Sequence, residues 1–217
     1  MSTNCIELRV ARPNEEDLVL NVLRTIYYPE ESITISYVHG KQPTADDERF
    51  SLSFVAQGMV VLAEDKNAGT IVGISIAGPI EPGDPDRMIE EAATTETKKW
   101  ADILKLLALL ERTADVCGRY GIKKAYHVHI LAVDPACRGQ SLGLRLMQFQ
   151  MDLARKFCFD AISADFTSIY SARLADKLGM ETISQLSLAD YRDENGDKLF
   201  CPQEAHKLIK TCVKILH

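Results

Sequence analysis

Alternating apolar and polar residues predict strands near both ends of the chain. Residues 6–10 read Ile-Glu-Leu-Arg-Val, the two-residue period of a strand with one buried face. Residues 209–215 alternate in the same way. Two more uniformly apolar segments, 59–63 and 70–77, flank turn-forming residues at 65–69. This second arrangement predicts a hairpin.

Longer segments show the three-to-four-residue period of helices. Acidic residues at 15–17 suit the positive end of a first helix, which Pro29 stops. Further helices are expected at about 46–54, at 142–157 and at 171–178. A long helix in the middle of the chain carries an apolar stripe that suits a core-facing surface, although such a stripe could also line a ligand site. This stripe consists of Trp100, Ile103, Leu107, Leu110, Ala114 and Cys117.

Strands are also expected at 125–133 and 161–166, and the expected order of the elements is β-α-α-β-β-α-β-α-β-α-β-β. This order predicts a mixed α/β layer fold. Residues 79–86 are rich in proline and are expected to form a loop. The composition does not change across this loop, so it marks no domain boundary. A single domain over residues 1–217 is therefore expected.

Charge and cysteine usage narrow the class of protein. The formal net charge is −6 and the isoelectric point is near 5.4, which argues against nucleic acid as a partner. The most apolar stretch, 103–110, is interrupted by Lys105 and is too short to span a bilayer. The six cysteines form no C-x-x-C pair, and no spacing suggests a metal site. These features predict a cytoplasmic protein that binds neither nucleic acid nor membrane, with a monomer as the default state.

One segment combines the features of an anion-binding turn. Residues 129–143 read HILAVDPACRGQSLG, in which an apolar strand passes through a proline-containing turn into a glycine-bearing loop and then a helix. The first turn of a helix presents unpaired N–H groups and a partial positive charge, which favour anions. The segment lacks the lysine and hydroxyl residue of a P-loop and the spacing of a dinucleotide fingerprint. A pyrophosphate is the predicted ligand, and these features do not choose among pyrophosphate compounds.

The same segment resembles a known acetyl-CoA signature. Residues 138–143, Arg-Gly-Gln-Ser-Leu-Gly, are similar to the Arg/Gln-x-x-Gly-x-Gly/Ala loop of the GNAT superfamily of N-acetyltransferases. Residues 170–180, YSARLADKLGM, resemble a helix of that superfamily with a similar Lys-Leu-Gly ending. The resemblance implies a central, mixed, mostly antiparallel and twisted sheet with helices on both faces, and acetyl-CoA as cosubstrate without a metal. Ser141 departs from the signature, which has glycine there; it could crowd the cosubstrate or donate its hydroxyl to a phosphate.

Two further segments resemble insect arylalkylamine N-acetyltransferases. They are residues 25–34, TIYYPEESIT, and residues 188–206, LADYRDENGDKLFCPQEAH. The resemblance implies acetylation of a small amine such as dopamine, tyramine, octopamine or serotonin, by direct attack in a ternary complex. Two alternatives remain open. One is a different acceptor or donor, such as a polyamine, a protein amine or a longer acyl-CoA; the other is a non-catalytic module that binds acetyl-CoA.

The resemblance also implies which residues bind the cosubstrate. The backbone of the strand before the loop should bind the pantetheine arm, and the loop should hold the pyrophosphate. Ser168 is a further candidate for contact with the cosubstrate. The implied cosubstrate-binding residues are Leu131, Ala132, Val133, Arg138, Gly139, Gln140, Ser141, Leu142, Gly143 and Ser168.

The subfamily pattern implies a catalytic base at Glu31, or at Glu30 if the register slips by one residue. Without the resemblance, both would be interpreted as solvated loop carboxylates. Many superfamily members carry a tyrosine acid where this chain has Ala175, and the insect enzymes instead implicate serines one turn earlier. Ser171 and Thr167 occupy those places, with helix capping as the alternative. The residues implied to line the amine pocket are Tyr27, Tyr28 and His206. A structural role is the alternative for each.

Overall fold

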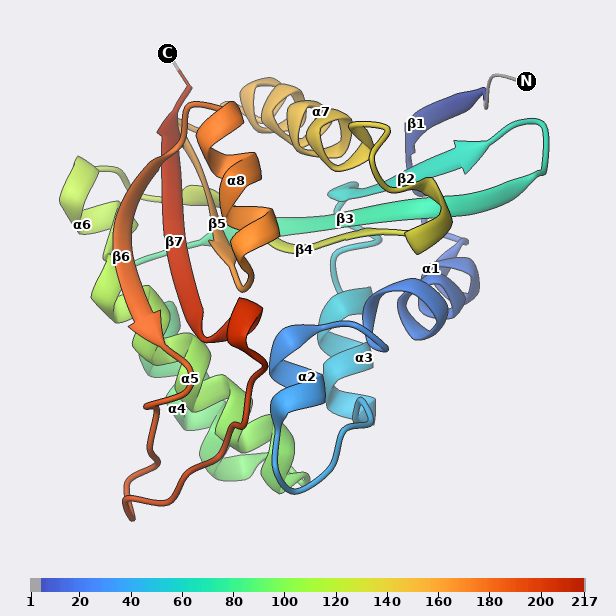
Figure 1. Ribbon diagram of the computed structural model, residues 1–217. Helices are drawn as coiled ribbons and strands as arrows, with labels where there is room; N and C mark the ends of the chain where they lie inside the picture. The colour runs from blue at the N-terminus through green and yellow to red at the C-terminus, as the bar shows by residue number, and fades with distance from the viewer. Residues whose placement is uncertain (1–4, 217) are drawn as a thin grey trace.

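The computed structural model describes residues 5–216, which form a seven-stranded sheet with helices on both faces (Figure 1). The strand order is β1-β2-β3-β4-β5-β7-β6, and every neighbouring pair is antiparallel except β4 and β5. The expected mixed, mostly antiparallel sheet is therefore confirmed. The strands are β1 (Ile6–Val10), β2 (Val60–Asp65), β3 (Thr70–Ile80), β4 (Ala125–Val133), β5 (Ala161–Phe166), β6 (Glu181–Ser187) and β7 (Leu208–Ile215).

The helices divide between the two faces of the sheet (Figure 1). Helices α7 and α8 pack on one face, while α1, α3 and α5 pack on the other, with α4 against α5. Within residues 5–216, no helix combines the length and the apolar character that crossing a membrane requires. The helical segments are α1 (Glu16–Val22), η1 (Leu23–Tyr27), α2 (Ser32–Ser36), α3 (Ala45–Leu52), α4 (Asp84–Thr94), α5 (Lys98–Ala114), α6 (Val116–Tyr120), η2 (Pro135–Cys137), α7 (Leu142–Lys156), α8 (Ile169–Lys177) and η3 (Glu204–His206).

Helix α7 is anchored over the centre of the sheet. Leu146 and Met147 are completely buried at successive positions of its inner face. Burying a side chain of this size contributes roughly 1.5–3 kcal/mol. The buried Gln150 accepts a hydrogen bond from the Tyr126 hydroxyl at 2.6 Å and donates one to the Ser75 carbonyl at 3.1 Å. These contacts hold α7 against β3 and β4.

The expected loop at 79–86 is wrong for most of its length. Strand β3 continues to Ile80 and α4 begins at Asp84. Pro79 is tolerated in the strand because β2 pairs with β3 only as far as Ile76, which leaves a free edge there. Pro85 lies in the first turn of α4, where a missing N–H costs no intrahelical hydrogen bond.

The expected long apolar helix is interrupted near its end. Helix α5 covers most of the stripe, but Asp115 adopts a left-handed conformation with φ of 40°. The Asp115 side chain accepts a hydrogen bond from the Gly118 N–H and starts the short helix α6. The last stripe residue, Cys117, therefore belongs to a separate helix.

The register between β4 and its neighbours opens the middle of the sheet. Strand β4 pairs with β3 along its length, but with β5 only from Tyr126 to Val128. Val128 pairs with Ala77 and Ile130 pairs with Ile76, so His129 is an extra residue that forms a β-bulge. Beyond the bulge, the edge of β4 that faces β5 has no strand partner within the described residues. This divergence creates the opening in which the candidate site lies.

Candidate active site

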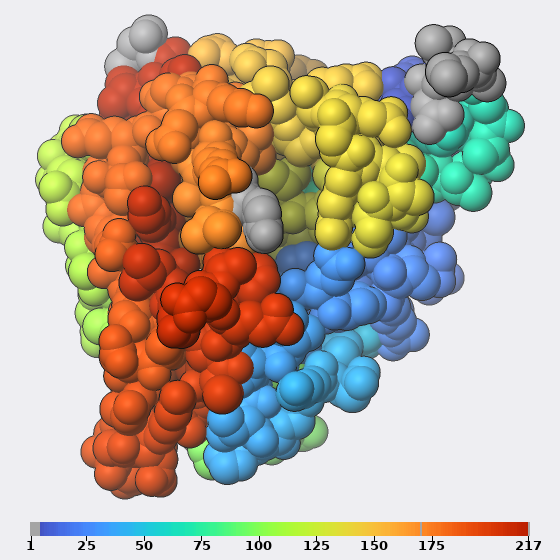
Figure 2. All heavy atoms as spheres, viewed as in Figure 1, coloured from blue at the N-terminus to red at the C-terminus, as the bar shows by residue number. Residues whose placement is uncertain are grey.

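An open cleft of about 1030 Å³ lies where β4 and β5 diverge. Figure 2 shows a hollow bordered by the yellow loop before α7, the orange and red C-terminal segments and the blue N-terminal helices. Every residue that the sequence predicts for catalysis or binding lines this cleft except Gln140, which is exposed in the loop and does not line it.

The turn before α7 forms the anion-binding side of the cleft. Gly139 has φ of 79°, a conformation that glycine adopts without strain, and a side chain there would meet no atom within 4 Å. Ser141 also adopts a left-handed conformation, with φ of 57°, immediately before α7. Its hydroxyl makes no capping hydrogen bond to α7, and its backbone occupies the conformation that the signature glycine favours. The loop thus holds the serine in a conformation that costs a residue with a side chain roughly 1–2 kcal/mol.

The unpaired edge of β4 forms the wall beside this turn. Leu131, Ala132 and Val133 all line the cleft beyond the point where pairing with β5 ends. A free strand edge presents backbone N–H and C=O groups that can pair with an extended amide chain. Such an edge and an anion-binding helix start fit the two amide groups and the pyrophosphate of a coenzyme A molecule. The expected pantetheine-binding strand and phosphate-binding loop thus lie side by side.

Glu31 lies on the opposite side of the cleft, at the start of α2. Its carboxylate accepts hydrogen bonds from the Ile33 N–H at 2.8 Å and the Thr34 N–H at 2.5 Å. Burial raises the pKa of Glu31, and these two donors offset part of the rise. Glu30, by contrast, is exposed and forms an ion pair with Arg138. The geometry thus separates the two neighbouring carboxylates into one half-buried group and one surface group.

The hydroxyl residues near α8 have clear structural partners. The Ser168 hydroxyl accepts from the Ser171 N–H at 3.1 Å, and the Ser171 hydroxyl accepts from the Ser168 N–H at 3.2 Å, which together form a capping box. The two hydroxyl oxygens lie 2.9 Å apart. Both residues and Thr167 also line the cleft. Ala175, at the place of the superfamily tyrosine, is buried in the core.

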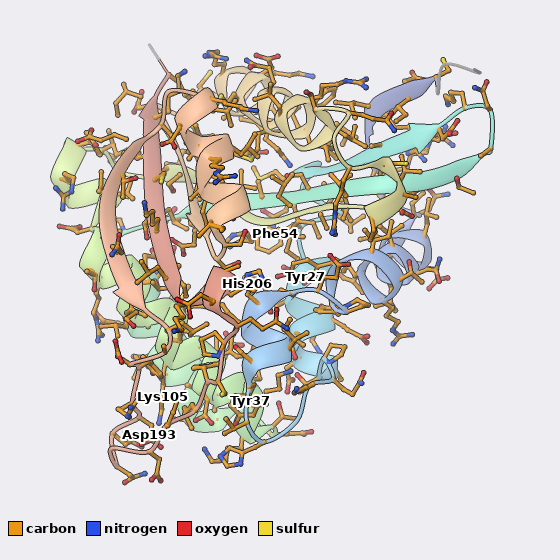
Figure 3. The ribbon with its side chains drawn as sticks, viewed as in Figure 1. Tyr27, Tyr37, Phe54, Lys105, Asp193 and His206 are labelled. Atoms are coloured by element: carbon orange, nitrogen blue, oxygen red, sulfur yellow. The ribbon has the colours of Figure 1, made fainter. Side chains whose placement is uncertain are left out.

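His206 links two segments that line the cleft. Its Nδ1 atom lies 2.9 Å from the Ser32 hydroxyl of α2 and 3.3 Å from the Thr167 carbonyl after β5. Figure 3 shows His206 and Tyr27 near the middle of the molecule, between the C-terminal strands and the N-terminal helices. His206 therefore holds the helix that begins at Glu31 against the segment that carries the α8 hydroxyls.

The aromatic residues of the N-terminal segment occupy different environments. Tyr27 is partly exposed within the cleft. Tyr28 also lines the cleft, but it is 4% exposed and its hydroxyl lies 3.4 Å from that of Ser51. Tyr37 belongs to the core beneath α5, and its hydroxyl donates to Asp102 at 2.7 Å. Tyr27 is thus the most accessible of the three rings to a ligand.

The inner end of the cleft contains polar residues that the sequence analysis did not identify. His127 and His129 of β4 have ring centroids 4.8 Å apart, and Asp165 of β5 lies beside them. Burial lowers the pKa of both histidines. The rings of Phe50 and Trp100 line the same region. The sequence could have indicated this cluster, because the two histidines lie two residues apart in a predicted strand and such residues share one face of a sheet.

Comparisons with known proteins agree with this geometry. Residues 23–180 match the model of the acetyltransferase (GNAT) family. A mosquito arylalkylamine N-acetyltransferase-like 5b shares 72% sequence identity with this chain. Its structure superposes with a TM-score of 0.96, over 97% of this chain and 100% of that chain. A polyamine N-acetyltransferase from Drosophila melanogaster, which catalyses the formation of N-acetylagmatine, is 37% identical with a TM-score of 0.91, over 97% of this chain and 100% of that chain. An Aedes aegypti arylalkylamine N-acetyltransferase 2 shares the fold at 24% identity and a TM-score of 0.88, over 99% of this chain and 100% of that chain. The chain therefore belongs to the acetyltransferase (GNAT) family and is an acetyl-CoA-dependent N-acetyltransferase.

Proposed function

We propose that this enzyme transfers the acetyl group of acetyl-CoA to the primary amine of a small arylalkylamine, with Glu31 as the base. The observation that carries the proposal is a half-buried carboxylate that faces an anion-binding helix start across one cleft. Similarity to the mosquito arylalkylamine N-acetyltransferase-like 5b supports the acceptor class. The partly exposed Tyr27 and the rings at the inner end of the cleft offer aromatic surfaces to an arylalkyl group.

The cosubstrate side of the site needs little chemistry from side chains. Bound acetyl-CoA supplies a thioester carbonyl as the electrophile and a thiolate leaving group, whose pKa of about 8.5 makes departure tolerable. The loop at 138–143 would hold the pyrophosphate, and the free edge of β4 would orient the carbonyl. The Ser171 and Thr167 hydroxyls lie in the same cleft and would donate to the departing sulfur.

The acceptor side requires a base. An alkylammonium has a pKa of roughly 10.4, so neutralising it at pH 7 costs on the order of 4–5 kcal/mol. The amine nitrogen forms the C–N bond, the C–S bond breaks, and the proton lost from nitrogen passes to Glu31, directly or through a water. The raised pKa of Glu31 suits this task because it brings the carboxylate closer in basicity to the amine.

A second acceptor class has specific support. The Drosophila melanogaster relative is a polyamine N-acetyltransferase and shares 37% of its sequence with this chain. The inner end of the cleft also contains Asp165, a carboxyl group that suits a cationic ligand better than an aromatic ring. A polyamine acceptor would use the same base and the same cosubstrate site.

Product analysis tests the proposed activity. Purified enzyme with acetyl-CoA is incubated with tyramine, dopamine, octopamine, serotonin, agmatine or spermidine, and mass spectrometry detects the N-acetylated product while free thiol is followed in parallel. We expect stoichiometric thiol and acetylated amine with at least one arylalkylamine. Acetylation of the polyamines alone would replace the first acceptor class with the second. Acetyl-CoA binding without any product would contradict catalysis of small-amine acetylation.

A further inference from the structure

A small chamber continues from the inner end of the cleft. It has a volume of about 30 Å³, which is room for one group of the size of a water molecule. His127, His129 and Asp165 line both the cleft and this chamber, so the chamber adjoins the cleft at these residues. Glu111 of α5 and Thr211 of β7 complete the chamber. A ligand that enters the cleft can therefore place one small group at its inner end.

Two carboxyl groups face this chamber. Asp165 accepts a hydrogen bond from the Thr211 hydroxyl at 2.6 Å, and its second oxygen lies 3.8 Å from His127 Nε2. The carboxyl group of Glu111 has no hydrogen bond or ion pair within the described part of the chain. Burial and the nearby Asp165 raise the pKa of Glu111 to about 7. Arg87 lowers that pKa only in part, and it pairs instead with Asp84 and Glu81 outside the chamber.

The histidines add polar atoms but no balancing charge. His129 Nε2 is buried and has no hydrogen-bond partner among the side chains and backbone that the structure describes. The His129 ring stacks on Phe54 with centroids 4.9 Å apart, which fixes its orientation. Burial lowers the pKa of His127 and His129, so both are neutral near pH 7. A neutral imidazole can accept a hydrogen bond from a ligand at an unprotonated ring nitrogen.

We infer that this chamber, lined by Glu111, Asp165 and His129, binds a second cationic group of the acceptor. The cleft then also accepts a diamine or polyamine, with one amine at Glu31 and a distal ammonium in the chamber. This inference rests on the proposed acetyl transfer to a small amine and adds a subsite for the second acceptor class. A phenol hydroxyl would satisfy one polar atom here and would leave both carboxyl groups without a cation, whereas an ammonium supplies three donors and a positive charge.

Isosteric amine pairs provide the test. A series of α,ω-diamines of increasing chain length is compared with monoamines in which a methyl group replaces the distal ammonium. At the chain length that reaches the chamber, we expect the wild-type enzyme to favour the diamine in kcat/KM by about tenfold or more. In the Glu111→Gln, Asp165→Asn double variant this ratio should fall to about one, mainly through KM of the diamine. The ratio is internal to each variant, so partial misfolding cannot produce the change.

The control variant is Glu90→Gln, which removes one exposed carboxylate from the neighbouring helix α4 and should keep the wild-type ratio. Equal kcat/KM for diamines and monoamines in the wild type, or an unchanged preference in the double variant, would overturn the subsite and leave acetyl transfer intact. Calorimetric titration of the diamine in the presence of coenzyme A separates the two proposals further. Diamine binding that the double variant loses, without any turnover, would support the subsite and contradict the transfer; no diamine binding would overturn the subsite.

Discussion

The raised pKa of Glu111 implies that this carboxyl group lowers the stability of the folded protein at neutral and alkaline pH. Its pKa of about 7 lies above the ordinary value of 4.5 because the folded protein disfavours its charge. Below pH 4.5 the group is protonated in both the folded and the unfolded state and there is no penalty. As pH rises from 4.5 to 7, the unfolded state loses its proton first, and the folded state loses relative stability. Above pH 7 the loss is constant.

The Glu111→Gln variant should therefore be more stable than the wild type at pH 8, by on the order of 1–3 kcal/mol, with little difference at acidic pH. Urea unfolding of both proteins across pH 4 to 8 measures this difference, because that range covers both the ordinary pKa of 4.5 and the raised pKa of about 7. The Glu90→Gln variant should show no such trend, because that carboxylate is exposed. A wild type that is more stable than Glu111→Gln at pH 8 would show that the charge is already compensated within the protein.

Some residues of the site could be predicted from motifs in the sequence, and others could not. Glu31 and the loop at 138–143 stand in motifs that resemble family patterns, and the structure brings both to one cleft. Glu111 and Asp165 stand in no motif, and they are far apart in the chain. Glu111 lies on a helix whose apolar stripe predicted a core-facing surface. Because Glu111 is not part of that stripe, the sequence pattern predicts an ordinary solvated charge at this position. Only the packing of α5 across β5 makes it part of a chamber.

At the level of elements, hydrophobic period and turn composition predicted most of the strands and long helices. They did not predict the short helix α2 or the irregularity in β4. The alternation at 6–10 and 209–215 and the apolar segment at 125–133 all correspond to strands. Helix α2 has five residues, too few to show a helical period, and its start depends on the Glu31 cap. The divergence of β4 from β5 depends on a single bulged residue, His129, which alternation cannot mark. The cleft therefore lies between two features, α2 and the bulge in β4, that the hydrophobic pattern of the sequence does not predict.

The ion pair between Glu30 and Arg138 connects the segment before α2 with the loop before α7. Arg138 stands at the edge of the proposed pyrophosphate site, so Glu30 competes with the cosubstrate for its guanidinium. Exposed ion pairs contribute at most about 1 kcal/mol, which corresponds to roughly fivefold in affinity. The Glu30→Gln variant should therefore bind acetyl-CoA up to about fivefold more tightly at low salt.

Calorimetric titration with acetyl-CoA at two ionic strengths measures this effect, which should shrink at high salt. The Asp152→Asn variant breaks a comparable exposed pair with Arg155 on α7 and serves as the control with unchanged affinity. Weaker acetyl-CoA binding by Glu30→Gln would mean that the pair organises the loop rather than competes with the cosubstrate.

At the scale of the whole molecule, the cleft is a boundary between two groups of elements. The turn before α7 and the edge of β4 form one side, and the segment from Tyr27 to Ser36 forms the other. His206 bridges from η3 to Ser32 and to the Thr167 carbonyl, so the C-terminal segment holds the base in place. The sequence predicted these segments separately; their approach depends on long-range packing that no local pattern specifies.

The central claim is that Glu31 removes the proton of the acceptor amine. The measurement that tests it most directly is steady-state thiol release by the Glu31→Gln variant, with acetyl-CoA affinity and the urea midpoint recorded as controls for folding. Because a positioned base contributes typically about 10²–10⁴-fold, kcat/KM for the amine should fall by that factor while acetyl-CoA affinity stays unchanged. In the wild type, kcat should fall at acidic pH with a pKa above the ordinary 4.5, since protonated Glu31 cannot accept a proton. Turnover by Glu31→Gln within a few-fold of the wild type, with the same pH profile, would contradict the account.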